Sequence, residues 1–208
     1  STFSTYFGHH ISTIEGGIVT TDDKNIYEML LSIRSHGWDR DMSEETQKKL
    51  QKKWKVTEFN SLYTFYFAGF NLRSTDLQAF IGIDQIDKLD DWGACREENF
   101  YIYQDKIKNN YWKPKTADDS LTSNFAYPII HKKRDKIVNE LINNKVEVRP
   151  MVCGSMGTQP FYVKEYGELK LPKVTKIDKY GFYVPNNPKL TTMDIDFIST
   201  IINRFTNE

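Results

Sequence analysis

The first third of the chain combines two apolar strand patterns with one clear helical pattern. Residues 1–7 are predicted to form a strand that runs into a tight turn at Gly8, and the β-branched run 18–21 is predicted to form a second strand. Asp22 or Asp23 can cap a helix that ends near residues 36–37, where glycine permits a left-handed turn. The apolar positions of this helix follow the i, i+3, i+4, i+7 rule: Ile26, Met29, Leu30 and Ile33. A strand followed by a helix favours an α/β layer.

The middle of the chain is more varied. Residues 38–60 are polar and charged, which predicts a short surface helix within a long excursion. Residues 61–67 are aromatic and β-prone, and we assign the aromatic run 63–70 to the core. Thr75 is placed to cap a helix that reaches about residue 90; its apolar residues surround the helix, so we expect burial on more than one side. A second long helix, over about 91–110, carries three apolar residues on one face: Phe100, Tyr103 and Ile107.

The pattern changes in residues 111–123, which are polar and contain a proline and two aspartates, as in a linker. Beyond them we expect a strand (125–130), a helix from about Arg134, a strand (146–152), a loop-rich stretch, a strand (181–184) and a last helix. That helix has apolar residues at helical spacing: Phe197, Ile198, Ile201, Ile202 and Phe205. The chain therefore divides into residues 1–112 and a small α/β domain, 113–208.

Composition excludes several classes of function. Among 208 residues, 28 basic side chains balance 28 acidic ones, so nothing favours binding to nucleic acid or to a membrane surface. The two cysteines are far apart and fit no metal-site or disulfide pattern, which is typical of a reduced, cytoplasmic protein, and we assign no metal ligands. No apolar stretch approaches the roughly 20 residues that span a bilayer. The chain opens inside an apolar, strand-like element without an initiator Met, and we interpret it as missing an upstream part.

Residues 4–17 read Ser-Thr-Tyr-Phe-Gly-His-His-Ile-Ser-Thr-Ile-Glu-Gly-Gly. This segment resembles the active-site segment of the sugar aminotransferase family, within the fold-type I pyridoxal-phosphate enzymes. That family has a serine, then a lysine five residues later, then Glu-Gly-Gly six residues further on. Ser4 and Glu15 fall in this register, and His9 occupies the position of the Schiff-base lysine.

Further motifs occur in the family's order. Gly-Phe-Asn-Leu-Arg at 69–73, with the helix that follows it, resembles one family segment. Asn-Phe-Ala-Tyr-Pro at 124–128, Val-Arg-Pro at 148–150 and Gly-Phe-Tyr-Val at 181–184 resemble the C-terminal domain. The resemblance covers nearly the whole chain but only the second half of the family's usual length. It implies an α/β fold: the C-terminal part of a PLP-dependent transferase-like large domain, followed by the small domain.

The histidine changes the expected chemistry. Lysine holds the pyridoxal cofactor as an imine and moves protons, whereas imidazole forms no stable imine of that kind. Imidazole still accepts a proton near neutral pH, because its ordinary pKa is about 6.5. The replacement resembles the family's dehydratases, lyases that remove the C3 hydroxyl of a nucleotide-linked 4-keto-6-deoxyhexose; GDP-4-keto-6-deoxymannose is the favoured substrate. An iron–sulfur branch also carries histidine here, but two cysteines cannot supply an all-thiolate cluster.

The resemblance assigns roles to three residues, and the chemistry of guanidinium groups adds two candidates. His9 would be catalytic, as base and acid; Ser4 would bind the cofactor phosphate. Asn71 would reach the phosphate of the neighbouring subunit, which implies a homodimer with shared active sites. Arg73 and Arg149 are candidates for binding the nucleotide-sugar, since guanidinium suits phosphate geometry. The cofactor would be pyridoxal phosphate or pyridoxamine phosphate, with glutamate as amino donor, and its remaining ligands would lie upstream of residue 1.

Two alternatives stay open: an aminotransferase-like enzyme that acts on nucleotide-sugars and uses His9 otherwise, and a non-catalytic remnant of the fold. The chain alone could also be inactive, because half of the pocket would be missing. Of the other polar candidates, Glu15 is expected to shape a turn, His36 to serve a helix C-terminus, and His131 to lie on the surface.

Overall fold

The computed structural model describes residues 1–108, 110 and 112–205. The chain forms two compact units, 1–87 and 88–208. The predicted domain boundary after residue 112 concerns the complete family fold and stays a prediction. The second long helix ends at Lys106, earlier than the predicted end near Asn110, and the predicted linker start at Tyr111 lies outside the described residues.

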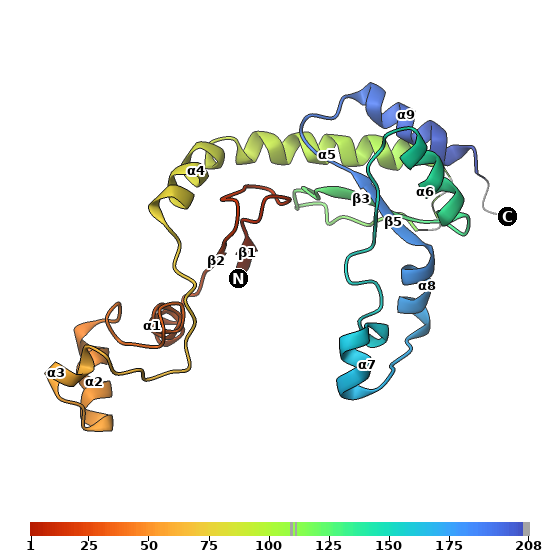
Figure 1. The fold of residues 1–208 in the computed structure, drawn as a ribbon. Helices are drawn as coiled ribbons and strands as arrows, with labels where there is room; N and C mark the ends of the chain where they lie inside the picture. Colours follow the sequence, from red (N-terminus) through yellow and green to blue (C-terminus); the bar gives the residue numbers. More distant parts are fainter. Residues whose placement is uncertain (109, 111, 206–208) are drawn as a thin grey trace. The chain divides into compact units, whose positions relative to one another are not determined.

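The first unit contains a two-stranded antiparallel hairpin and four helices (Figure 1). The strands are β1 (Thr2–Ser4) and β2 (Gly17–Val19), with Phe3 opposite Ile18. The helices are α1 (Lys24–Ile33), α2 (Glu44–Trp54), α3 (Glu58–Ser61) and α4 (Asp76–Ile86). Both predicted strands and the first predicted helix are confirmed, at somewhat shorter lengths.

Caps explain where these helices begin. Asp23 accepts hydrogen bonds from the backbone N–H groups of Asn25 and Ile26, as predicted for the start of α1. Thr75 and Gln78 form a reciprocal capping box at the start of α4. The predicted strand over 61–67 is wrong: the N–H groups of Tyr66 and Phe67 both donate to the carbonyl of Gly37, so this run is a loop held by one acceptor.

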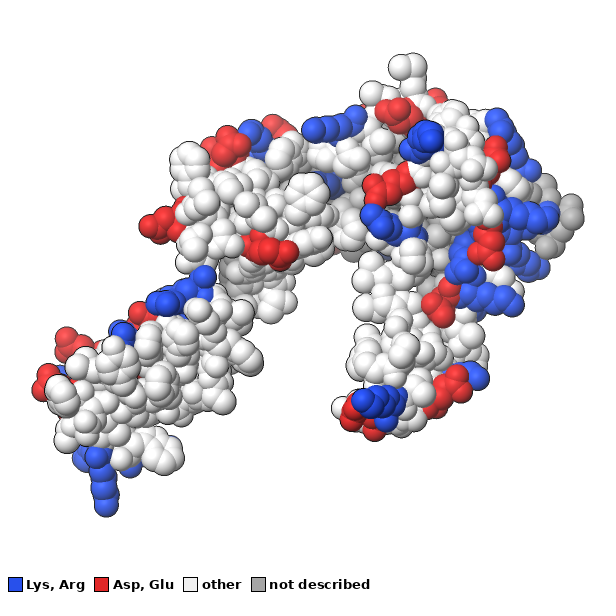
Figure 2. Space-filling model, in the orientation of Figure 1, with Lys and Arg blue, Asp and Glu red and all other residues white. Residues whose placement is uncertain are grey.

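The first unit buries little apolar surface. Met42 is the one large apolar side chain that is buried among residues 1–87. The aromatic run 63–70 is not core, and α4 is not buried on several sides, contrary to both expectations: Tyr63 is 75% exposed and Phe80 73%. Other exposed apolar residues of this unit include Phe3, Phe7, Ile14, Trp54, Phe59, Leu62, Phe70, Leu72, Leu77, Ile83 and Ile86. Figure 2 shows charged side chains scattered over this unit, with uncharged surface between them.

The second unit packs helices against a three-stranded antiparallel sheet of order β3-β5-β4. Its strands are β3 (Ala126–Ile130), β4 (Arg149–Pro150) and β5 (Gly181–Pro185). Its helices are α5 (Leu89–Lys106), α6 (Arg134–Asn143), a short 3-10 turn (Met156–Thr158), α7 (Pro160–Tyr166), α8 (Pro172–Tyr180) and α9 (Thr192–Asn203). The predicted strand 146–152 shrinks to two residues, and the stretch expected to be loop-rich contains α7 and α8.

The core of the second unit lies where α5, α6 and α9 meet the sheet (Figure 1). The predicted face of α5 is confirmed, since Phe100, Tyr103 and Ile107 are all buried. The other side chains of this core come from the sheet and from α6 and α9: Tyr127, Ile129, Ile137, Leu141, Phe182, Val184, Ile195, Ile198, Ile201 and Ile202. This unit therefore has the hydrophobic core that the first unit lacks.

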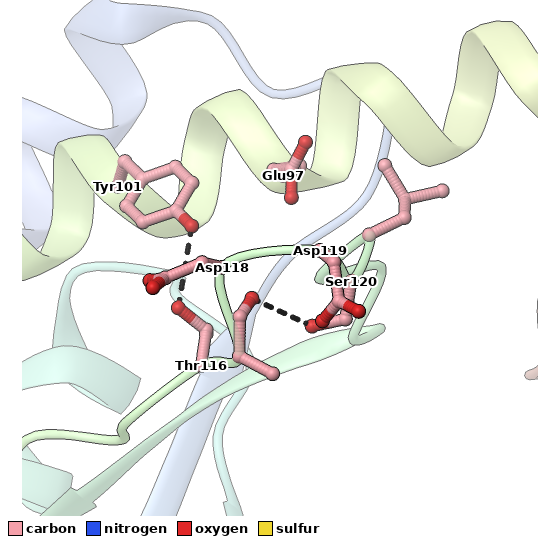
Figure 3. A pocket seen from close by; sticks show the side chains of 8 residues that line it. Glu97, Tyr101, Thr116, Asp118, Asp119 and Ser120 are labelled. Carbon is pink, nitrogen blue, oxygen red and sulfur yellow. Dashed lines mark hydrogen bonds between the residues drawn. The ribbon is translucent and has the colours of Figure 1, made fainter.

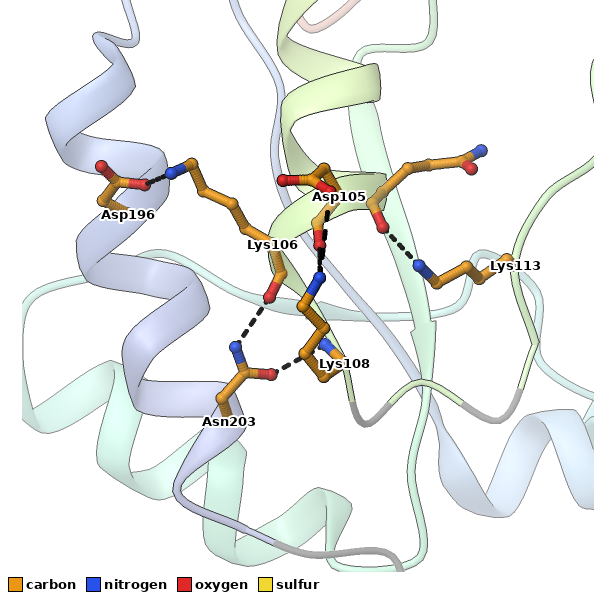
Figure 4. A network of polar contacts seen from close by, with 7 residues as sticks. Asp105, Lys106, Lys108, Lys113, Asp196 and Asn203 are labelled. Carbon is orange, nitrogen blue, oxygen red and sulfur yellow. Dashed lines mark hydrogen bonds and ion pairs between the residues drawn. The ribbon is translucent and has the colours of Figure 1, made fainter.

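Side-chain hydrogen bonds tie α5 to the last residue of β5 and to the residue after it. The amide of the buried Asn186 donates to the carbonyl of Arg96 at 2.9 Å, and the Tyr103 hydroxyl donates to the carbonyl of Pro185 at 3.0 Å. Burial raises the pKa of Tyr103, so its hydroxyl stays a donor. At the far end of α5, Lys106 pairs with Asp196 at 2.6 Å and Asn203 donates to the Lys106 carbonyl (Figure 4). These contacts fix α5 against α9.

His131 is fully buried, which contradicts the expected surface position. Its Nδ1 accepts from the backbone N–H of Lys133 at 3.0 Å, and its Nε2 lies 3.2 Å from the carbonyl oxygen of Phe205. In the described part of the chain, no helix combines the length and the apolarity that crossing a membrane requires.

Candidate functional site

The segment that carries His9 is the loop of the β1–β2 hairpin. Beyond the paired strands, the backbone N–H of Thr5 donates to the carbonyl of Gly16 at 3.0 Å, and that of Phe7 to the carbonyl of Ile14 at 3.1 Å. The N–H of Thr13 returns to the carbonyl of Thr5 at 2.9 Å. Residues 8–12 therefore form a closed arc between two hydrogen-bonded arms.

His9 lies within this arc and is half-buried. Its backbone N–H donates to the carbonyl of Tyr6 at 3.0 Å. The two rings meet edge to face, with centroids 5.8 Å apart and planes at 73°, an arrangement that aromatic rings prefer. The imidazole is therefore oriented by a turn and by a neighbouring ring.

Ser4 is the last residue of β1 on the same hairpin, so Ser4 and His9 belong to one local unit. The Ser4 hydroxyl oxygen accepts from the backbone N–H of Tyr6 at 3.2 Å. That bond leaves the hydroxyl proton of this exposed residue available to donate. A phosphate oxygen is a suitable acceptor, so the residue fits the role of a phosphate ligand.

The Glu-Gly-Gly motif begins the second arm of the hairpin, and the role expected of Glu15 stays a prediction. Gly16 has a φ of +151°, a conformation that side chains rarely adopt. A Cβ there would lie 2.7 Å from the hydroxyl oxygen of Thr5 and 2.8 Å from that of Thr13. These two hydroxyls are 2.6 Å apart and bridge the arms. Glycine is required because the hydroxyl pair occupies the space.

Asn71 and Arg73 lie in a different part of the first unit. Here a ladder of backbone hydrogen bonds joins the residues after α1 to residues 70–72; Asn71 is one of these residues and Arg73 comes directly after them. The N–H of His36 donates to the carbonyl of Phe70 at 2.7 Å, and the N–H of Leu72 to that of Arg34 at 2.8 Å. His36 thus follows the end of α1, as expected, with a φ of 63°. Asn71 and Arg73 are exposed, and Arg73 forms no ion pair with any described residue.

Beside this ladder lies a cluster of aromatic and charged residues that the sequence did not single out. The Arg40 guanidinium stacks 3.8 Å from the ring centroid of Trp38 and 5.0 Å from that of Tyr63. Asp39 is buried, and its Oδ2 has no hydrogen-bond partner among the described residues. Burial, reinforced by the charge of Asp39, raises the pKa of Tyr66.

Arg149 belongs to the second unit, in β4 opposite Tyr183. With Arg134, it lines a cavity of about 190 Å³, and its guanidinium pairs with Glu147. A larger cavity of about 480 Å³ lies between α5 and residues 116–121 (Figure 3). Glu97, Asp118 and Asp119 line it, so its negative charge does not suit a phosphate. No cluster of three or more metal-ligating side chains occurs within the described residues.

The sequence analysis missed two glutamines of α4. Gln78 and Gln85 hydrogen-bond to the backbone of the hairpin arm at Glu15 and Ser12. Their spacing of seven residues places both on one face of a helix, with Gly82 between them. That spacing is the signal that could have indicated a polar contact face.

Comparison with known proteins gives consistent matches. A profile of the DegT/DnrJ/EryC1/StrS aminotransferase family matches residues 1–203. The GDP-4-keto-6-deoxy-D-mannose 3-dehydratase of Yersinia pseudotuberculosis is 32% identical over 212 residues, covering 98% of this chain and 52% of that protein. The enzyme of the same name from Escherichia coli O55:H7 is 31% identical over 215 residues, covering 97% and 53%.

Solved structures agree with the sequence matches. A crystal structure of GDP-4-keto-6-deoxymannose-3-dehydratase with a trapped PLP–glutamate geminal diamine superposes with a TM-score of 0.82 at 28% identity. The match covers 97% of this chain and 54% of that one. The expected α/β fold class, part of an aminotransferase-type fold, is thereby confirmed. The chain spans about half the length of the curated relatives it matches.

Proposed function

The chain belongs to the DegT/DnrJ/EryC1/StrS aminotransferase family, and on that premise we propose that it is part of a dehydratase that uses pyridoxamine phosphate. The reaction removes the C3 hydroxyl of a nucleotide-linked 4-keto-6-deoxyhexose, GDP-4-keto-6-deoxymannose. One observation carries the proposal: the hairpin loop that matches the family's lysine segment presents His9 in place of the lysine. Relatives that are 31–32% identical bear the corresponding dehydratase name.

When bound, pyridoxamine phosphate supplies an amine that condenses with a ketone and a ring that accepts electrons. Ser4 donates its free hydroxyl proton to the phosphate and so anchors the group beside the hairpin. His9, which has no amine to form a covalent link, first accepts a proton on its imidazole as base and then, as acid, delivers that proton to the departing C3 hydroxyl. The edge-to-face contact with the Tyr6 ring favours this orientation of the imidazole.

The remaining roles follow the same premise. Asn71 reaches the phosphate bound by a second copy of the chain, so the active protein is a homodimer with shared sites. Arg73 and Arg149 bind the charged nucleotide-sugar, since both guanidinium groups are exposed. Glutamate restores the cofactor amine after each turnover. The solved relative with a PLP–glutamate adduct supports this amino donor. We place the protein in the cytoplasm.

The decisive test is product analysis with the protein in its full natural length. It would be incubated with GDP-4-keto-6-deoxymannose, pyridoxal phosphate and glutamate, and the sugar examined by mass spectrometry and NMR. We expect loss of the C3 hydroxyl, and abolition of that loss in His9→Asn. Formation of an amino sugar instead would identify an aminotransferase. A protein that never takes up the cofactor, judged by its visible absorbance, would be a non-catalytic remnant of the fold.

The shared site can be tested by mixing two inactive variants. His9→Asn and Asn71→Ala each remove one contribution, and after unfolding and refolding together they form mixed dimers with one intact site. We expect part of the activity to return only in the mixture. Absence of recovery, with dimers of both variants present, would show that Asn71 does not serve the neighbouring site.

A further inference from the structure

Helix α4 holds the loop that carries His9 in part through the side-chain amide of Gln85. The side-chain oxygen of Gln85 accepts from the backbone N–H of Ser12 at 2.8 Å, and its nitrogen donates to the carbonyl of Ser12 at 2.6 Å. The amide of Gln85 therefore binds both the backbone N–H and the backbone carbonyl of Ser12. An amide can do this because it carries a donor and an acceptor side by side, as a neighbouring strand would.

A second amide, about two turns earlier on the same face of α4, also holds the loop. The nitrogen of Gln78 donates to the carbonyl of Glu15 at 2.7 Å, while its oxygen accepts from the backbone N–H of Thr75 at 2.9 Å. The capping box of α4 therefore fixes the orientation of the amide that reaches the loop. The donor end is left free for Glu15.

Between the two glutamines the helix lies directly against the loop. A Cβ added to Gly82 would lie 3.1 Å from the Cγ2 of Thr13, a closer approach than most side chains make. Gln78, Gly82 and Gln85 occupy positions i, i+4 and i+7, which form one face of α4. The helix thus contacts the loop at residue 12, the last residue of the arc, and at residues 13 and 15 beyond it.

We propose that Gln85, assisted by Gln78, is a positioning residue for His9: it fixes the loop backbone at Ser12, three residues beyond the imidazole. The inference rests on the proposed function, because only a proton-transfer role for His9 requires its imidazole to be held in a fixed position. The Thr5–Thr13 hydroxyl pair carries the constraint to the other arm of the hairpin. The arc is then held on both sides, and an untethered arc would let the imidazole move relative to its substrate.

Two substitutions at residue 85 separate hydrogen bonding from packing. Gln85→Met keeps the length of the side chain and loses both hydrogen bonds. Gln85→Glu keeps the shape but presents two acceptors at neutral pH, so its carboxylate faces the carbonyl of Ser12. Protonation of that carboxyl at lower pH restores a donor. We therefore expect the activity of Gln85→Glu, relative to the parent protein, to rise as pH falls, whereas that of Gln85→Met stays low.

The experiment uses the protein in its full natural length and compares kcat, KM, the thermal midpoint and the NMR signals of the His9 ring. The control is Gln51→Met, which changes a half-buried glutamine of α2. For Gln85→Met we expect a fall in kcat of about tenfold or more, as small misplacements of a catalytic group produce. KM and the thermal midpoint should stay close to those of Gln51→Met, and the His9 signals should shift or broaden.

An unchanged kcat, or a lowered kcat with unchanged His9 signals, would overturn the proposal. If Gln85→Met fails to fold, Gln78→Met serves the same comparison, because it removes the second tether while Gln85 remains. The ring signals also distinguish this inference from the proposed function. A parent protein without dehydratase activity would refute the function, while the His9 signals would still report whether the glutamines hold the loop.

Discussion

At the scale of single residues, the buried histidine of the second unit has the clearest consequence. Nδ1 of His131 accepts from the Lys133 N–H, so in the neutral ring the proton is on Nε2, which donates to the carbonyl of Phe205. Burial lowers the pKa of His131 below its ordinary value of 6.5. The unfolded chain therefore binds this proton more readily than the folded one does.

This difference predicts an acid-sensitive second unit. The stability that neutral His131 contributes is complete above about pH 6.5 and is lost as pH falls through the lower, folded-state pKa. Urea unfolding between pH 7.5 and 4.5 should show this loss, and the His131→Asn variant should show a shallower dependence on pH. Equal slopes for the two proteins would contradict the assignment.

Two glycines at the end of α1 make a second prediction. Gly37 and Gly69 cross so closely that a Cβ on Gly69 would lie 2.2 Å from the backbone nitrogen of Gly37. The atoms that this Cβ would meet belong to the backbone, which cannot move away as a flexible side chain could. Gly69→Ala should therefore lower the free energy of unfolding by about 2 kcal/mol or more.

The matched control is Gly8→Ala, where the nearest atoms would be 3.6 Å away, at ordinary contact distance. Denaturant titration of both variants measures the difference. If Gly69→Ala is as stable as Gly8→Ala, the two backbones are not as close as described.

At the scale of elements, α4 and α9 begin with the same capping box but differ in what it supports. In the capping box of α9, the side chains of Thr191 and Asp194 hydrogen-bond at the helix start and to each other. The box of α4 also orients Gln78 toward Glu15. A helix cap usually affects only the stability of the protein. The cap of α4 is also linked, through Gln78, to the loop that carries His9.

Replacing the two threonines should reveal that difference. Thr75→Ala should cost about 1 kcal/mol in stability, the usual effect of a lost cap, and should also lower kcat of the full-length protein. Thr191→Ala should destabilise the protein without lowering kcat. Thermal denaturation and initial-rate measurements on both variants provide the check, and an equal effect on kcat would count against a special role for the first cap.

The elements also show how far the sequence alone could lead. Periodicity located α1, α5, α6 and α9, because each buries or presents one apolar stripe. It failed at α7 and α8, which begin at Pro160 and Pro172. The sequence analysis predicts a loop-rich stretch there, whereas proline is well tolerated in the first turn of a helix. The run 61–67 has strand-like composition, but the shared carbonyl of Gly37 holds it as a loop.

The candidate site was foreseen in part. The spacing of Ser4, His9 and Glu15 located the hairpin, since local motifs survive in sequence. The glutamines of α4 are 63 and 73 residues away from their partners. No local pattern encodes such a pairing, and the missed burial of His131 has the same cause: its partner Phe205 is 74 residues away.

At the scale of the whole molecule, the two units differ in what holds them together. The second has a continuous core, whereas the first relies on caps, backbone ladders and polar contacts. Exposed apolar surface on this scale usually marks a surface that another part of an assembly covers. The first unit should therefore be the less stable part of the isolated chain.

Hydrogen exchange of the isolated 208-residue chain can test this. We expect strong protection in α5, β3, β5 and α9, and weak protection throughout residues 1–87, together with binding of an apolar dye. Protection in the first unit should rise in the full-length protein. Uniform protection along the isolated chain would contradict the difference in stability.

The core of the second unit has a consequence for synthesis in the cell. Helix α9 contributes four buried isoleucines, among them Ile195 and Ile202, and packs on α5, about a hundred residues earlier in the chain. A ribosome must therefore release α9 from its exit tunnel before that core can close. Until then the apolar faces of α5 and β5 are exposed to solvent, and we expect a chaperone that acts on nascent chains to bind them.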